Sequence, residues 1–80
     1  MWYVYLLRSI ANPAKTYVGM TDDVSARVKK HNDSGTKFTM THRPWELVSY
    51  IAVTDKHKAA KLESYLKIGS GHAWAHKHLW

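Results

Sequence analysis

Five side chains of this sequence have the chemical types needed to cut a phosphodiester bond. They are two phenols, a guanidinium, an imidazole and a carboxylate: Tyr5, Tyr17, Arg27, His31 and Glu63. Arginine is always charged and binds phosphate oxygens in bidentate fashion, and the ordinary imidazole pKa of about 6.5 suits proton transfer. A single carboxylate suits Mg²⁺, which keeps several waters and takes further ligands from substrate phosphates. The set therefore predicts metal-assisted phosphodiester hydrolysis.

Hydrophobic periodicity predicts the elements that position these residues. The first part of the chain is predicted to form a strand over 2–8, a turn at 11–14 and a strand over 16–20. A helix follows from Thr21 to about Lys30–Asn32 and stops near Asp33-Ser34-Gly35, and a polar loop over 33–45 leads to a third strand over 45–53. The last part is predicted to form a helix from Thr54-Asp55 to about Ile68, a break at Gly69-Ser70-Gly71 and a short helix over 73–79. Tyr5 and Tyr17 then lie on neighbouring strands of a hairpin, where both hydroxyls can meet.

The first helix places its charged residues beside its apolar face. On a helical wheel Val24 and Val28 share the face that must point at the sheet, and Arg27 and His31 border it. Burial of a guanidinium is costly without an anionic partner. Two interpretations stay open, because Arg27 can equally reach outward to an acidic neighbour while His31 serves as an ordinary helix-end residue.

The second long helix repeats this arrangement with a carboxylate. Ala59, Leu62 and Leu66 form its apolar stripe, and Glu63 lies within the same arc. A carboxylate at a buried edge needs a cation, a metal ion or a shifted pKa. The alternative is a structural ion pair between Glu63 and Lys67 at i, i+4.

Length and composition agree with a nucleic-acid partner. The 80 residues are expected to form one domain over 1–80, and their formal charge is +6 without counting histidines. There is no cysteine, which excludes thiol chemistry and cysteine-based zinc sites. No apolar run approaches the ~20 residues of a membrane span, so we expect a cytoplasmic protein without a membrane partner. Residues expected to contact nucleic acid are Lys30, Lys37, Thr39, His42, Arg43 and Lys67.

The ordered set of motifs resembles the GIY-YIG nuclease family. Tyr3-Val4-Tyr5 stands where that family has Gly-Ile-Tyr, and Tyr17-Val18-Gly19 stands for Tyr-Ile-Gly. The chain looks closest to the small stand-alone members related to the nuclease domain of the UvrC repair subunit. The remaining positions that carry the resemblance, which covers nearly the whole chain, are Thr21, Arg27, His31, Arg43-Pro44, Ala60, Glu63 and Lys67.

The resemblance implies an α/β (α+β) fold with a three-stranded antiparallel sheet flanked by helices, and hydrolysis of DNA with one Mg²⁺ or Mn²⁺ ion. Carried over, Glu63 would hold the metal, Arg27 would stabilise the pentacovalent phosphate, and Tyr17 would position or activate water. Tyr5 would hydrogen-bond near Tyr17, and His31 would act as base or phosphate ligand. Met20 stands where some relatives carry a lysine, so one active-site cation is absent.

Three functions follow from these observations. The first is a metal-dependent DNA endonuclease, structure-selective or partner-dependent, in DNA repair or processing. The second is a nucleic-acid-binding module with weak or absent catalysis. The third is a protein-interaction domain anchored by Trp74 and Trp80. The sequence leaves open RNA as the substrate, a repair protein as partner, and a homodimer.

Overall fold

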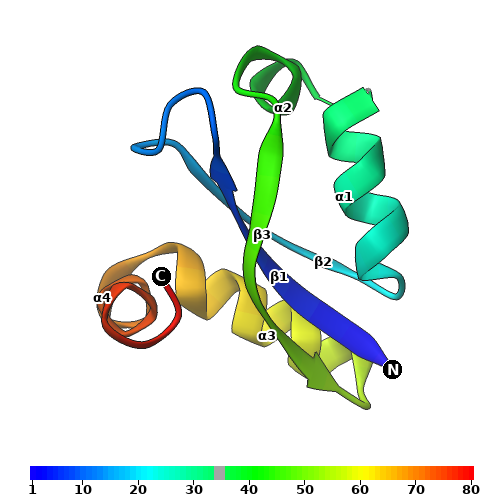
Figure 1. Cartoon of the computed structure of the whole chain (residues 1–80). Coiled ribbons are helices and arrows are strands. Elements are labelled where there is room, and N and C mark those ends of the chain that lie inside the picture. Colours follow the sequence, from blue (N-terminus) through cyan, green and yellow to red (C-terminus); the bar gives the residue numbers. More distant parts are fainter. Residues whose placement is uncertain (34–35) are drawn as a thin grey trace.

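The computed structural model describes residues 1–33 and 36–80, which form a three-stranded antiparallel sheet and four helices (Figure 1). Their bounds are β1 Trp2–Ser9, β2 Thr16–Thr21, α1 Val24–Asp33, α2 Lys37–Thr41, β3 Trp45–Val53, α3 Lys56–Lys67 and α4 Gly69–His78. The strand order is β2-β1-β3, so β2 and β3 are the outer strands. The predicted α+β architecture is therefore confirmed.

β1 lies at the centre of the fold because both of its faces are covered. Its residues Val4 to Leu7 are all fully buried, as expected for a strand packed on two sides. Val4 and Leu6 pack against α3 and α4, through Ala59, Leu66 and Ala75. On the other face Tyr5 and Leu7 pack with Trp45, Val24 and Val28. Figure 1 shows the same division, with α1 and α2 on one side of the sheet and α3 and α4 on the other.

Two predictions about the helices need correction. The segment predicted as a polar loop over 33–45 contains α2, whose start is capped by Thr36 and whose Thr39 is fully buried. The last helix begins at Gly69 rather than Ala73, because the chain turns at Ile68 and at Gly69, which has a φ of +62°. Gly71 then packs tightly on the end of α3, where a Cβ would overlap the backbone of Tyr65.

The start of α1 also differs from its prediction. Asp23, not Thr21, caps the helix, and its carboxylate accepts a hydrogen bond from the Ala26 amide at 3.1 Å. Thr21 instead accepts one from the Asp23 amide. The predicted stop at Ser34 and Gly35 lies outside the described residues. By contrast, the predicted cap at Asp55 is confirmed, since its carboxylate accepts hydrogen bonds from two amides of α3.

Within the described ranges, no helix has the length and apolar character required to cross a membrane.

Candidate active site

A buried hydrogen bond joins the first tyrosine to the histidine. The Tyr5 hydroxyl lies 2.9 Å from Nε2 of His31, although the two residues are 26 positions apart in the chain. Tyr5 is fully buried and His31 is 5% exposed. The Nδ1 atom of His31 is also buried, and it has no hydrogen-bond partner among the described residues. A polar nitrogen left in this state normally has a partner such as water or a ligand.

The local structure that permits this contact is set by Gly19. In the register of β1 and β2, Gly19 is the partner of Tyr5. A Cβ at position 19 would overlap the Tyr5 hydroxyl and the ring carbon that carries it. The missing side chain therefore lets the Tyr5 phenol lie across β2 towards the outer edge of the sheet.

The position of His31 in this contact depends on the end of α1. Asn32, the neighbour of His31, holds this end to β3 by accepting from the Trp45 amide at 2.6 Å and donating to the Trp45 carbonyl at 3.2 Å. His31 is thereby fixed above the sheet.

Tyr17 covers this pair from β2 and is partly exposed. Its ring lies 6.3 Å from the Tyr5 ring and 4.9 Å from the His31 imidazole, centroid to centroid. The structure thus brings together Tyr5, Tyr17 and His31, as the hairpin and the helical wheel predicted.

Phe38 extends this aromatic surface and was not among the predicted site residues. Phe38 lies on α2, is 41% exposed and stacks on Tyr17 at 6.4 Å. Its signal in the sequence is a lone aromatic residue within an otherwise polar segment. The short helix that presents it was not expected.

The electrostatics keep Tyr5 protonated and His31 neutral at neutral pH. Burial, together with the nearby Tyr17, raises the pKa of Tyr5 to about 12 against the opposing effect of Arg27. Burial first, and then the positive charges of Arg27 and Lys30, lower the pKa of His31. A neutral imidazole and a neutral phenol can form this hydrogen bond in either direction, because each group both donates and accepts.

Arg27 and Glu63 approach Tyr5 from opposite faces of the sheet. Arg27 comes from α1, and its charge favours the ionised form of the Tyr5 phenol. Glu63 comes from α3, and its charge acts on the same phenol with the opposite sign. The predicted site residues therefore come from helices on both faces of the sheet rather than from a single face.

Glu63 has Lys67 as its partner, at 3.2 Å between Oε2 and Nζ. The Glu63 side chain is 22% exposed and that of Lys67 is 48% exposed. A partly exposed pair at i, i+4 contributes little stability. Within residues 1–33 and 36–80, no three His, Asp or Glu side chains form a metal-binding group. One accessible carboxylate fits an ion that takes its remaining ligands from water and substrate.

The other predicted nucleic-acid contacts fall into two groups. Lys30 and Lys37 are exposed, on α1 and α2. Thr39 is fully buried, its hydroxyl donates to the Thr36 carbonyl, and its own carbonyl accepts from the Trp45 indole at 2.8 Å. The prediction that Thr39 contacts nucleic acid is therefore wrong, because its polar groups are used within the fold.

His42 and Arg43 have structural contacts of their own. The His42 ring packs edge-on against Phe38 at 4.8 Å. Arg43 is exposed and donates to the Asn32 and Asp33 carbonyls, each at 3.4 Å, at the end of α1. A cation is favourable there because the last carbonyls of a helix lack partners.

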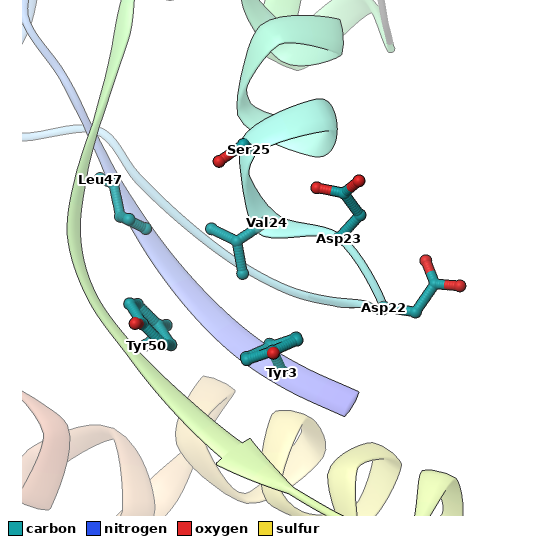
Figure 2. Close-up of a pocket in the computed structure, with 7 residues that line it drawn as sticks. All are labelled: Tyr3, Asp22, Asp23, Val24, Ser25, Leu47 and Tyr50. Carbon is teal, nitrogen blue, oxygen red and sulfur yellow. The ribbon is translucent and has the colours of Figure 1, made fainter. Parts of the chain in front are cut away.

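Two hollows lie beside these residues. The hollow in Figure 2, about 300 Å³, opens between the start of α1 and the sheet; its lining residues are Tyr3, Asp22, Asp23, Val24, Ser25, Leu47 and Tyr50. A second hollow of about 230 Å³ lies beneath β2; its lining residues are Thr16, Val18, Leu66, Lys67, His72 and Trp80. Of the predicted site residues, only Lys67 lines either one.

These features define a small α+β domain with a phenol–imidazole pair near an outer edge of its sheet. The chain belongs to the GIY-YIG family of nuclease domains, whose catalytic domain matches residues 1–72. The resemblance seen in the sequence motifs is thereby confirmed.

Its relatives include small proteins of similar length. A UPF0213 protein of Staphylococcus epidermidis is 41% identical over 66 residues, which cover 81% of this chain and 78% of that protein. The solution structure of a UPF0213 protein from Bacillus halodurans matches 96% of this chain and 82% of its own with 33% identity and a TM-score of 0.55.

The structure-specific endonuclease subunit slx1 of Talaromyces marneffei is also similar, with 42% identity over 52 residues. The match covers 59% of this chain but only 13% of that larger protein.

Proposed function

We propose that this protein is a metal-dependent endonuclease that hydrolyses DNA and selects its substrate by structure or through a partner in DNA repair or processing. The family supports a nuclease, and the name of the slx1 relative supports a structure-specific one. The observation that carries the proposal is the 2.9 Å contact between Tyr5 and His31 beneath the partly exposed Tyr17. A packing role alone does not require a buried imidazole with an unpartnered nitrogen.

The roles of the tyrosines follow from their exposure. Tyr5 is fully buried and keeps its proton at neutral pH, since its pKa is raised to about 12 by burial and by Tyr17. It is therefore a hydrogen-bonding group, not the base. Tyr17 is the partly exposed phenol of the pair, so it is the tyrosine that can meet and orient the attacking water.

His31 is suited to hold a proton during the reaction. Its pKa is lowered by burial and by neighbouring cations, so the imidazole is neutral and able to accept. Because Nε2 is held by the Tyr5 hydroxyl, Nδ1 is the imidazole nitrogen left to take or give a proton. A positioned acid–base group of this type contributes about 100- to 10,000-fold to a rate.

Arg27 and Glu63 complete the site from the two sides of β2. Arg27 stabilises the charge that develops on the pentacovalent phosphate, through the planar fork that matches phosphate oxygens. Glu63 is the residue that would hold Mg²⁺ or Mn²⁺, and Lys67 must leave it when the ion binds. When bound, such an ion supplies positive charge to the phosphate oxygens.

A cleavage panel tests this function. Purified protein is incubated with Mg²⁺ or Mn²⁺ and labelled duplex, nicked, flap, bubble and junction DNAs, next to Glu63→Ala and Arg27→Ala. Lys61→Ala is the matched control, because Lys61 is an exposed residue of α3 away from Glu63. We expect cleavage of some structured DNAs by the wild type and the control, with loss in both site variants. Undiminished cutting in either site variant contradicts these roles.

A second candidate is a module that binds nucleic acid without cutting it. The Glu63–Lys67 pair favours it, because the carboxylate is already neutralised within the fold. Salt-dependent DNA affinity without cleavage on any DNA of the panel, with either metal, would select this function.

A further inference from the structure

The smaller hollow has the chemistry of a binding site for a base and its phosphate. We call it the Trp80 hollow, and it is lined by Thr16, Val18, Leu66, Lys67, His72 and Trp80. Val18 and Leu66 supply apolar walls, Trp80 supplies an aromatic ring, and Lys67 supplies a cation at the rim. No Asp or Glu side chain lines it. Unpaired bases are commonly bound by stacking on aromatic rings while cations hold the backbone.

Trp80 is held in place by the rest of the fold. Its amide donates to the Ala75 carbonyl at 3.0 Å, and its main-chain oxygen accepts from Arg8 at 3.3 Å. The Arg8 guanidinium also lies over the indole ring, 5.7 Å from its centroid. A ring fixed in this way loses little conformational freedom when a base stacks on it.

The size of the Trp80 hollow limits its occupant. Its volume of about 230 Å³ is below the roughly 300–1,000 Å³ of pockets that take drug-sized ligands. One base fits such a space, whereas a base pair does not. The hollow in Figure 2 is larger, but Asp22 and Asp23 line it and would repel a phosphate backbone.

The Trp80 hollow adjoins the candidate active site around the edge of β2. Thr16 lines the hollow, and the next residue, Tyr17, belongs to the aromatic surface on the opposite face of the sheet. Lys67 lines the hollow and also contacts Glu63 at 3.2 Å. A nucleic-acid strand that crosses this edge therefore meets both sites within neighbouring nucleotides.

We propose that the Trp80 hollow is a subsite that binds one unpaired base of the substrate, stacked on Trp80, with Lys67 on its phosphate. This inference rests on the proposed function and narrows the substrate class to nucleic acids that present an unpaired nucleotide next to the cleaved bond, such as flaps and bulges. Fully paired DNA leaves the subsite empty.

Binding without metal tests the subsite separately from catalysis. Fluorescence anisotropy in EDTA compares a dye-labelled duplex with the same duplex carrying a single-stranded flap. We expect Trp80→Leu to lose about five- to 150-fold of the affinity for the flap DNA, the range that base stacking provides, and to keep its affinity for the duplex. Trp80→Phe should restore most of the loss because it retains an aromatic face.

Trp74→Leu is the matched control. Trp74 is a 42% exposed tryptophan of α4 that does not line the hollow, so its loss should leave both affinities unchanged. An unchanged preference for flap DNA in a folded Trp80→Leu protein, or an equal loss in Trp74→Leu, overturns the proposal. Folding is checked by circular dichroism and thermal denaturation.

A measurement on the wild type covers the case in which Trp80→Leu does not fold. The indole N–H resonance of Trp80 is followed by NMR during titration with deoxythymidine monophosphate and, separately, with inorganic phosphate. We expect a shift with the nucleotide only. No shift, or the same shift with phosphate, overturns base binding in the hollow.

The two proposals fail in distinguishable ways. A preference for flap DNA that depends on Trp80, combined with no cleavage in the panel, leaves the subsite standing and rejects the nuclease. Cleavage that depends on Glu63, combined with an unchanged preference in Trp80→Leu, leaves the nuclease standing and rejects the subsite.

Discussion

Gly19 and Tyr5 are register partners in adjacent strands, and the space that a side chain at Gly19 would fill is occupied by the Tyr5 hydroxyl. The glycine is thus a steric requirement of the Tyr5–His31 contact rather than a turn residue. The Tyr5 phenol can cross β2 only because Gly19 lacks a Cβ. The glycine of the Tyr17-Val18-Gly19 motif is therefore required by the geometry of the site.

Gly19→Ala should therefore damage both stability and activity. The new methyl group must push the Tyr5 ring away from His31, and overpacking of a close-packed region costs about 1–3 kcal/mol. We expect a lower denaturation midpoint in urea, together with strongly reduced nicking of structured DNA.

A double-mutant cycle with Tyr5→Leu isolates the cause of that effect. If the clash is with the phenol, alanine at position 19 should cost much less stability once Tyr5 is leucine. Equal costs in the two backgrounds would show that the glycine acts through the Tyr17 ring or the backbone of β2 instead.

Tyr5→Phe removes only the hydroxyl, so its effect reports the hydrogen bond. The Nε2 atom of His31 would lose its partner inside the protein, and a buried polar atom left unpaired costs about 1–3 kcal/mol. We expect that loss in the free energy of unfolding measured by urea denaturation. Tyr50→Phe is the matched control, because Tyr50 is 54% exposed, and it should change stability by less than about 0.5 kcal/mol. If Tyr5→Phe leaves the free energy of unfolding unchanged, a water molecule must take the place of the lost hydroxyl.

Arg43→Ala separates a structural role from contact with nucleic acid. The guanidinium donates to two carbonyls at the end of α1, and a cation at this position contributes about 0.3–1 kcal/mol. We expect a stability loss of this size and only a modest fall in DNA affinity, measured by denaturation and by anisotropy. Lys37→Ala, at an exposed position of α2, should instead leave stability unchanged and lower the DNA affinity clearly. A large loss of affinity with unchanged stability in Arg43→Ala would make it a direct phosphate contact.

The strands and the apolar faces of the two long helices could be predicted from the sequence, because hydrophobic periodicity depends only on residues that are close together in the chain. The predicted span of β3 matches the structure, and Val24 and Val28 pack on the sheet as the helical wheel indicated. The same wheel placed His31 at the border of this face, and the structure buries it there.

Other features depend on contacts that periodicity does not encode. Residues 37–41 read as polar, yet they form a helix because Thr36 caps it and the Trp45 indole binds the Thr39 carbonyl. Gly69 and Gly71 read as a break, yet Gly71 lies inside α4 because only a glycine fits against Tyr65. The helical wheels also could not show that α1 and α3 cover opposite faces of the sheet, so the approach of Arg27 and Glu63 to Tyr5 from two sides could be seen only in the tertiary structure.

The burial of His31 has a consequence for stability as a function of pH. The groups that face it are the Tyr5 hydroxyl on β1, the Tyr17 ring on β2, and the cations Arg27 and Lys30 on its own helix. Burial, followed by these two cations, lowers the pKa of His31 below its ordinary value of 6.5. The unfolded chain therefore binds more protons than the folded protein between that lowered value and about 6.5.

Stability should consequently fall as the pH drops below about 6.5 and level off beneath the pKa of folded His31. The measurement is the free energy of unfolding from urea titrations at a series of pH values between neutrality and mild acid. His31→Gln should flatten this slope, because glutamine keeps hydrogen-bonding capacity without titrating, whereas His57→Gln, an exposed position on α3, should preserve it. A slope that persists unchanged in His31→Gln would assign the pH dependence to other groups and would remove the argument that His31 is held neutral by its surroundings.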